Sequence, residues 1–327
     1  MNSFGRIFRV SLFGESHGRA IGVVVDGVRP GLPLSTDDFA DDIRRRGPGL
    51  PGTTPRTEND LPEMVSGWLN GYTTGAPLAI IFRNTNVRSH DYERIKDLPR
   101  PGHADFVAYK KFSGYNDYRG GGHFSGRITL ALVAAGVIAK KMIDPVEVHA
   151  KLVTVGGSTD IENTINKAMS ANDSVGGLVE CRVSGIPIGW GEPFFDSVES
   201  VISHLAFAIP GVKGIEFGSG FAAASMFGSA HNDAFIDASG ATSSNNAGGI
   251  LGGISNGNEL QFRVAVKPTS SIAREQQTIN MRTGMPEKLV VTGRHDTCIA
   301  LRVPVVLEAV AAIALADLAA IQNKSKG

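Results

Sequence analysis

The stretch Arg119-Gly120-Gly121-Gly122-His123-Phe124-Ser125-Gly126-Arg127 is followed directly by an apolar segment, 128–143, that is rich in alanine and leucine. Its composition predicts a helix that begins where the glycine loop ends. A glycine-rich loop at a helix N-terminus presents backbone N–H groups to an anion, so the pattern is typical of phosphate binding. It matches neither the Rossmann nor the Walker pattern. A plain turn before a helix remains the alternative.

Strand patterns and helix patterns alternate on both sides of this loop. Two internal similarities of sequence indicate similar halves. Gly293-Arg294 precedes a second apolar helix, as Gly126-Arg127 does, and segment 22–31 resembles segment 177–187. We therefore expect an α+β fold with halves 1–150 and 151–327, without the repeated βαβ units of a parallel sheet. Since no proline- or serine-rich linker separates the halves, we expect a single domain. The expected strands are 8–13, 21–26, 78–82, 178–183 and 261–266, and the other expected helices are 36–46, 197–207 and 304–320.

Composition excludes several classes of protein. The chain has 327 residues, 42% of them hydrophobic, and its 32 basic and 32 acidic residues balance. This neutrality argues against nucleic-acid binding. Two cysteines form neither a disulfide framework nor a zinc site, and no metal is expected. The N-terminus lacks a secretory pattern, and the apolar run 303–321 carries a proline and two carboxylates, so we expect a cytoplasmic protein without a membrane span.

Four loops place histidine beside glycine or arginine. Arginine offers a fixed positive fork for phosphate or carboxylate, and histidine exchanges a proton near neutral pH. A single such histidine is more often structural than catalytic, but four similar loops favour one shared site for a polyanionic ligand with acid–base chemistry. The histidines are His17 in 14–18, His103 in 100–105, His123 in 119–127 and His295 in 293–296.

Three further segments are candidates for the same site. The glycine cluster 245–255 would let backbone lie against a flat ligand, or it forms a hairpin corner. Segment 267–271 follows a strand and offers one cation and three hydroxyls to a phosphate or ribityl chain, although ordinary turns look similar. The triplet 44–46 ends the expected helix 36–46 and reads equally well as a solvated helix end. Asp296 is either an acid–base group or the ion-pair partner of Arg294.

Six motifs together identify a family resemblance. They are GESHG (14–18), RPGHAD (100–105), DYRGGG (117–122), SNNAGGILGGIS (244–255), KPTSS (267–271) and GRHD (293–296). In this order, over about 4–318, they resemble chorismate synthase. The resemblance implies a phosphate lyase of the shikimate pathway, which makes chorismate by 1,4-anti elimination of phosphate from 5-enolpyruvylshikimate 3-phosphate. It also implies reduced FMN with no net redox change, NADPH where a member reduces its own flavin, a β-α-β sandwich with helices between antiparallel sheets, and a homotetramer.

The resemblance also implies roles for individual residues. His17 is expected to protonate the departing phosphate, His103 to manage the proton at flavin N1, and Asp296 to help flavin N5 accept the substrate proton. Expected substrate contacts are Arg45, Arg46, Arg100, Arg127 and Arg294. Expected cofactor contacts are His123, Phe124, Ser125, Gly252, Lys267, Pro268, Thr269, Ser270, Ser271, Arg294 and, toward NADPH, Arg46.

The chain departs from the family pattern after the triple glycine. Many members read RSSARET there, whereas this chain reads His-Phe-Ser-Gly-Arg-Ile-Thr over 123–129. The change removes one cation and the glutamate, but it keeps Ser125 and Arg127. The resemblance is therefore weaker at His123 and Phe124 than at Ser125 and Arg127.

Two other functions compete with the lyase. An NAD(P)H-dependent flavin reductase could use the same pocket, although the chain lacks a dinucleotide-binding fingerprint. A non-catalytic anion- or RNA-binding protein could also carry arginine–glycine loops, but neutral charge and 7% aromatic content argue against a base-stacking surface. Replacing His17 and His103 separates these classes, because only an enzyme would lose turnover while it keeps its ligand.

Overall fold

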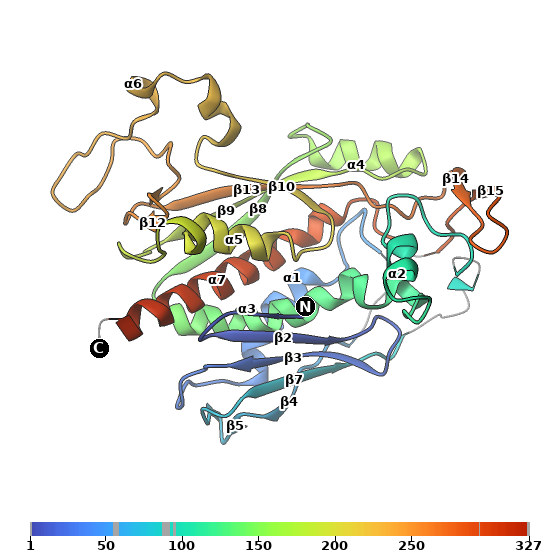
Figure 1. The fold of residues 1–327 in the computed structure, drawn as a ribbon, viewed down its shortest axis with the longest axis horizontal. Helices are drawn as coiled ribbons and strands as arrows, with labels where there is room; N and C mark the ends of the chain where they lie inside the picture. Colours follow the sequence, from blue (N-terminus) through green and yellow to red (C-terminus); the bar gives the residue numbers. More distant parts are fainter. Residues whose placement is uncertain (1, 55–58, 87–91, 94–95, 294, 326–327) are drawn as a thin grey trace.

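The computed structural model describes residues 2–54, 59–86, 92–93, 96–293 and 295–325. Its first half forms a five-stranded antiparallel sheet that faces a layer of helices (Figure 1). The central strand β3 (Ala20–Asp26) buries Ile21, Val23 and Val25 completely, which explains its β-branched composition. In spatial order the sheet consists of β1 (Ser3–Phe4), β2 (Arg9–Gly14), β3, β7 (Leu78–Arg83) and β4 (Glu63–Ser66).

The second half forms a four-stranded antiparallel sheet on the other side of the helices. Its strand β13 alternates buried and more exposed positions, as expected for a sheet with one face on the core. In spatial order the sheet consists of β10 (Val212–Phe217), β13 (Leu260–Val266), β9 (Gly177–Ser184) and β8 (Glu147–Val155).

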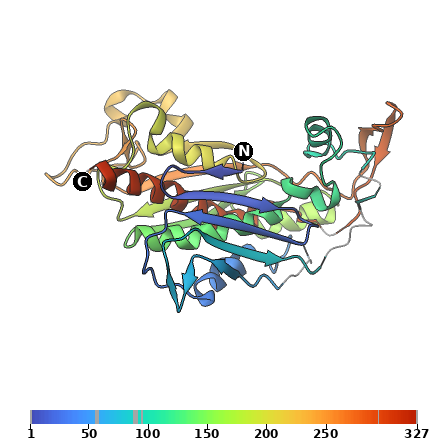
Figure 2. The ribbon, with the colours of Figure 1, turned by 60° about the horizontal axis from the view of Figure 1, so that its bottom comes forward.

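Helices α3 (Thr129–Ile143) and α7 (Val303–Ser325) lie between the two sheets (Figures 1 and 2). They approach so closely that a Cβ on Gly136 of α3 would lie 2.3 Å from the Cβ of Ala309 on α7. The segment Ile299–Lys324 is long and apolar enough to cross a membrane, but 78% of its apolar window is buried inside the protein. It is therefore a core helix, and the expected β-α-β sandwich of class α+β is confirmed.

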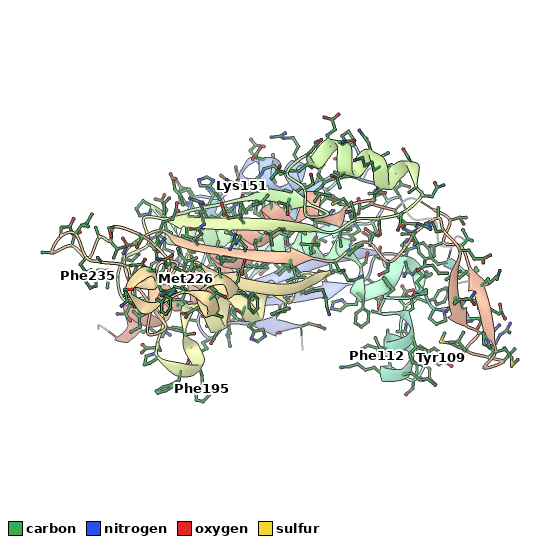
Figure 3. The ribbon with its side chains drawn as sticks, turned by 90° about the horizontal axis from the view of Figure 1, so that it is seen from above. Tyr109, Phe112, Lys151, Phe195, Met226 and Phe235 are labelled. Carbon is green, nitrogen blue, oxygen red and sulfur yellow. The ribbon has the colours of Figure 1, made fainter. Side chains whose placement is uncertain are left out.

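Shorter elements surround this sandwich. Helix α1 (Ala40–Arg46) packs on α3 and α7, α5 (Val198–Ala206) packs on α7 and β10, and α4 (Ile161–Ser170) packs on β8. Figure 3 shows Tyr109 and Phe112 at one end of the molecule and Phe195, Met226 and Phe235 at the other. The remaining helices and strands are α2 (Asp105–Lys111), α6 (Gly228–His231), β5 (Trp68–Leu69), β6 (Tyr72–Thr73), β11 (Ile250–Leu251), β12 (Ile254–Ser255), β14 (Gln276–Ile279) and β15 (Pro286–Leu289).

The two halves place their strands in the same order. Spatial order β2-β3-β7-β4 in the first half corresponds to β8-β9-β13-β10 in the second, and each half then continues into its long helix, α3 or α7. Among these four strands of each half, the one that comes last in the chain, β7 or β13, lies between the strands that come second and third. Strand β8 spans positions 150 and 151, so the natural boundary between the halves lies just before it, after α3.

Candidate active site

The histidine and arginine loops meet at a cleft of about 720 Å³ on one side of the helical layer. Segments distant in the sequence line it, among them 102–104, 123–129 and 269–271. One end is rich in arginine and histidine. The other end is apolar and is formed by α3, α7 and the chain after α5, with Leu132, Ile209 and Ile313 in its walls. The volume is in the range of sites for cofactors and small ligands.

The triple glycine brings two predicted catalytic histidines together. Gly120, Gly121 and Gly122 have φ angles of 59°, 80° and 54°, a left-handed backbone that side chains disfavour. A Cβ on Gly120 would lie 2.5 Å from Cδ2 of His17, and a Cβ on Gly121 would lie 3.3 Å from Cε1 of His103. The loop can therefore pass between the two imidazoles only because it has no side chains.

The His17 loop is held from two sides. The Ser16 backbone N–H donates to the carbonyl of Gly122 at 3.0 Å, and the Asn84 amide donates to the carbonyls of Glu15 at 3.0 Å and Gly18 at 2.8 Å. His17 is only 7% exposed, and its ring meets the edge of a Tyr92 ring, with centroids 5.2 Å apart. The imidazole thus lies in the wall of the cleft, behind Gly120.

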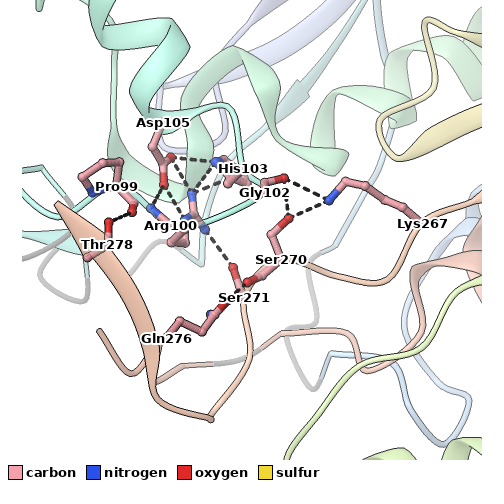
Figure 4. A network of polar contacts seen from close by, with 10 residues as sticks. All are labelled: Pro99, Arg100, Gly102, His103, Asp105, Lys267, Ser270, Ser271, Gln276 and Thr278. Carbon is pink, nitrogen blue, oxygen red and sulfur yellow. Dashed lines mark hydrogen bonds and ion pairs between the residues drawn. The ribbon is translucent and has the colours of Figure 1, made fainter. Parts of the chain in front are cut away.

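His103 belongs to a network of charged groups (Figure 4). Its Nδ1 lies 2.7 Å from Oδ1 of Asp105, which also accepts from Arg100 Nη2 at 2.8 Å. Arg100 Nε donates to Oδ2 of Asp105 at 2.7 Å, and Nη1 donates to Ser271 at 3.0 Å. Burial opposes the ionised form of Asp105, but bonds from Arg100 and His103 outweigh it and hold the pKa of Asp105 well below its ordinary value. The carboxylate therefore orients both cleft residues.

The segment after β13 closes onto the His103 loop. Lys267 Nζ donates to Ser270 Oγ at 2.6 Å and to the carbonyl of Gly102 at 3.1 Å, and Ser270 Oγ also donates to that carbonyl at 2.7 Å. Burial, with Lys213 nearby, lowers the pKa of Lys267. Thr269 Oγ1 is buried in the cleft wall with no hydrogen-bond partner within the described part of the chain.

A cluster of arginines forms the base of the cleft. Arg46 is 4% exposed and donates to the carbonyl of Gly126 at 2.9 Å, and Arg302 Nε donates to the carbonyl of Arg46 at 2.8 Å. Arg127 Nη2 lies 2.9 Å from Oδ1 of Asp60, whose Oδ2 is 3.7 Å from Arg46 Nη1. Burial, together with Arg302 and Arg127, lowers the pKa of Arg46 well below its ordinary value. Buried positive charge in this excess favours an anionic ligand.

Asp296 lies beside this cluster. Its Oδ1 accepts from the Thr54 backbone N–H at 2.7 Å, and its Oδ2 lies 3.2 Å from Arg302 Nη1. Asp296 and its neighbour His295 both line the cleft. Among the described residues no group of histidine, cysteine and carboxylate side chains could hold a metal ion.

Most of the predicted site residues lie in or against this one cleft, three described residues do not, and one residue is not described. Arg45 does not line the cleft: its side chain is 34% exposed and its Nη2 binds Oε1 of Glu308 at 2.6 Å, so the structure does not bring it to the expected substrate. Gly252 lies in the turn between β11 and β12, outside the cleft, and Pro268 packs near Gly176. Arg294 lies outside the described residues. The cleft is lined by His103, His123, Phe124, Ser125, Lys267, Thr269, Ser270, Ser271, Asp296, Arg46, Arg100 and Arg127, with His17 directly behind Gly120.

Sequence reasoning missed three groups that organise the cleft. Asp105 stands inside the RPGHAD motif, and its place two residues after His103 was a usable signal. Asp60 and Arg302 lie in no glycine loop. Arg302 enters the cleft because it ends the 3₁₀ turn Ile299–Arg302 just before α7, and Asp60 because the chain before β4 runs past Arg46 and Arg127. Such long-range proximity leaves no local pattern.

Together, the sandwich and the cleft define a class: an enzyme that binds a polyanionic ligand between arginines and moves protons with histidine and aspartate. The family model of chorismate synthase matches residues 8–320. A chorismate synthase of Chitinophaga pinensis is 62% identical over 326 residues, covering 99% of this chain and 98% of that protein. One of Dehalococcoides mccartyi is 45% identical over 350 residues, with 97% and 96% covered. A crystal structure of chorismate synthase superposes with a TM-score of 0.75 at 25% identity, over 98% of this chain and 93% of that one.

The chain belongs to the chorismate synthase family. It is a carbon–oxygen lyase that eliminates phosphate from 5-enolpyruvylshikimate 3-phosphate by a 1,4-anti reaction, dependent on reduced FMN but without net redox change, and the product is chorismate. This membership rules out the purely non-catalytic anion- or RNA-binding alternative.

Proposed function

We propose that the cleft between α3, α7 and the glycine loops is where this chain holds reduced FMN and 5-enolpyruvylshikimate 3-phosphate together. The observation that carries the proposal is the passage of the triple glycine between His17 and His103, which leaves His103 in the lining of the arginine-rich cleft and His17 directly behind Gly120, which also lines it. A substrate with a phosphate and carboxylates matches the positive end of this space.

The segment 267–271 fits a flavin nucleotide. Lys267 offers a cation at the rim, and the buried Thr269 hydroxyl without a partner within the described chain is suited to a polar group of a bound molecule. The apolar end, with Leu132 and Ile209, suits the hydrophobic edge of a ring system. Reduced FMN, when bound, lends electron density to the substrate as phosphate leaves and recovers it afterwards.

His17 is the proposed acid for the leaving phosphate. Because it lies in a wall fixed by Ser16 and Asn84, its imidazole is positioned before substrate arrives. Phosphate leaves more readily when its developing charge is neutralised, and a proton from imidazolium does this. The arginines proposed to orient the substrate are Arg46, Arg100 and Arg127, together with Arg294 on the resemblance alone.

His103 and Asp296 are the proposed proton carriers on the flavin side. Asp105 Oδ1 lies 2.7 Å from Nδ1 of His103, and Arg100 Nη2 lies 3.2 Å from its Nε2, so these two partners hold the ring in one orientation in the cleft lining. Asp296, held by Thr54 and Arg302, is proposed to help receive the proton that the substrate ring loses. A serine or asparagine at either position would bind ligands but could not exchange the proton.

The first test is the formation of chorismate from 5-enolpyruvylshikimate 3-phosphate without oxygen, either with chemically reduced FMN or with oxidised FMN and NADPH. Turnover with reduced FMN alone is expected of a monofunctional enzyme. Turnover in both samples would add NADPH as a cofactor and an intrinsic flavin reductase activity. Folded protein that binds FMN and turns over in neither sample would contradict the proposed site.

Replacing the histidines tests their roles. We expect His17→Ala and His103→Ala to lower kcat by ~10²–10⁴-fold, the usual contribution of a positioned acid or base. Affinity for FMN and for the substrate should change much less, and equilibrium binding measures both. Arg45→Lys is the matched control, since its side chain binds Glu308 and does not line the cleft, and it should leave the KM for the substrate unchanged. A His17 variant with full turnover would exclude it as the acid.

We further propose a cytoplasmic homotetramer. The support is an array of exposed aromatic side chains at one end of the molecule, among them Phe195 and Phe235 (Figure 3). Large exposed apolar patches mark protein interfaces.

A further inference from the structure

His123 has both of its ring nitrogens in contact with the protein. Nδ1 lies 2.8 Å from the carbonyl oxygen of Gly14, and Nε2 lies 3.1 Å from Oδ1 of Asn2. A carbonyl oxygen accepts, so Nδ1 carries the proton and donates. The imidazole thus joins the glycine loop to the end of β2 and to the N-terminal segment, and its polar atoms are already used by the chain.

The bond to Gly14 acts at the base of the His17 loop. Gly14 has a φ of 99° and opens the sequence Gly14-Glu15-Ser16-His17-Gly18. Gly122, which directly precedes His123, accepts a hydrogen bond from the Ser16 backbone N–H at 3.0 Å. Two successive residues of the glycine loop therefore hold the loop of His17 at two points, one through backbone and one through a side chain.

We infer that His123 is a positioning residue for His17 rather than a cofactor ligand. Its Nδ1–H fixes the start of the His17 loop against the triple glycine, so that the His17 imidazole stays behind Gly120, which lines the cleft. The contact of Nε2 with Asn2 is secondary, because it reaches only the N-terminal segment. This inference rests on the proposed role of His17 as the acid.

Two isosteric variants separate the two ring nitrogens. The side-chain amide of asparagine places its N–H near the position of Nδ1, whereas that of glutamine reaches only the position of Nε2. We expect His123→Asn to keep kcat within about 3-fold of the wild type, and His123→Gln to lower it ~10–100-fold, the size of effect that a misplaced catalytic group produces. The KM for the substrate and the Kd for FMN should stay within about 3-fold in both variants.

The matched control is Asn2→Ala, which removes only the contact to Nε2 and should leave kcat near that of the wild type. A double variant tests whether His123 acts through His17. If it does, His123→Gln causes no further loss of kcat in the His17→Ala background, whereas a general structural effect would add to that loss. Circular dichroism and FMN binding establish that each variant is folded.

Three results would overturn the inference. His123→Gln with wild-type kcat, beside an inactive His17→Ala, would show that His17 needs no such support. A rise of 10-fold or more in the Kd for FMN, with kcat restored at saturating FMN, would make His123 a cofactor ligand. Full turnover by His17→Ala would instead refute the proposed acid and, with it, this inference.

Discussion

Two arginines adjacent in the sequence have opposite surroundings. Arg46 reaches the cleft, whereas the partly exposed Arg45 binds the buried Glu308, which also accepts from Lys140 Nζ at 2.9 Å and from the Ala150 backbone at 2.9 Å. Burial raises the pKa of Glu308, but Arg45 and Lys140 outweigh burial and hold it below its ordinary value. The sequence of the triplet 44–46 does not show which arginine reaches the cleft. Consecutive helix positions point in different directions, and only the packing against α7 decides which side chain faces a ligand.

The carboxylate of Asp105 should make the stability of the protein depend on pH in the acid range. Its pKa is lowered in the folded state, so its ionised form stabilises the fold at pH values above the ordinary carboxylate pKa of 3.8, and this contribution is lost as the pH falls toward the lowered value. We expect Asp105→Asn to unfold at lower denaturant concentration than the wild type at pH 7. Below pH 3.8 the difference should shrink, and denaturant titrations at several pH values measure it. A difference independent of pH would mean that shape, not charge, matters at this position.

At the scale of elements, the crossing of α3 and α7 fixes the thickness of the molecule. A side chain at Gly136 would meet both Cβ and Cα of Ala309, at 2.3 Å and 2.5 Å. We expect Gly136→Val to lower the free energy of unfolding by about 1–3 kcal/mol, the usual cost of overpacking a core. Thermal or chemical denaturation measures the change.

Gly228 in α6 is the control for that substitution. A Cβ there would meet nothing within 4 Å, so Gly228→Ala should leave the unfolding midpoint almost unchanged. Equal destabilisation by both variants would contradict the tight contact between α3 and α7.

Local signals predicted the elements well. All five expected strands are present, and Ser35 forms a capping box with Asp38 at the start of the segment expected to be helical. The helix expected over 36–46 begins instead as a 3₁₀ turn, Thr36–Phe39, before α1. The last helix, expected over 304–320, continues to Ser325, since packing of the helix outweighs weak propensity at its end.

At the scale of the whole molecule, we propose that the chain arose by duplication of one unit. In both halves the four corresponding strands have the same spatial order and a long helix follows the last of them, although the second half carries an additional helix, α4, between its first two strands. The similar segments 22–31 and 177–187 overlap the corresponding strands β3 and β9. The cleft itself does not repeat, because its histidine loops come mainly from the first half and its segment 267–271 from the second.

The exposed aromatic end should control assembly. Phe221 and Phe227 are 81% and 85% exposed on the segment that projects after β10. We expect Phe221→Asp with Phe227→Asp to reduce the mass in solution below that of the proposed tetramer, because charge in an apolar interface is costly. Sedimentation velocity or light scattering measures the mass.

Leu69→Asp, on the distant strand β5, is the control and should leave the mass unchanged. A monomeric wild-type protein would contradict the proposed assembly, and a double variant that stays tetrameric would place the interface elsewhere.

How the cleft comes together was the part least open to prediction from sequence. Each glycine–histidine loop is locally recognisable, but the places of Asp60 and Arg302 and the pairing of Arg45 with Glu308 depend on contacts between residues far apart in the chain. Gly252 belongs to a recognised motif, yet its place on the β11–β12 turn lies away from the cleft. Spacing along a sequence carries no information about such distances.

The division of the cleft into a charged end and an apolar end bears on inhibitor design. A small molecule that imitates the substrate must carry several negative charges to satisfy Arg46, Arg100 and Arg127, and such molecules cross cell membranes poorly. The walls formed by Leu132, Ile209 and Ile313 offer the opposite chemistry to a compound of low charge. A weakly charged ring compound anchored there, with one short acidic arm toward the arginines, would combine affinity with permeability.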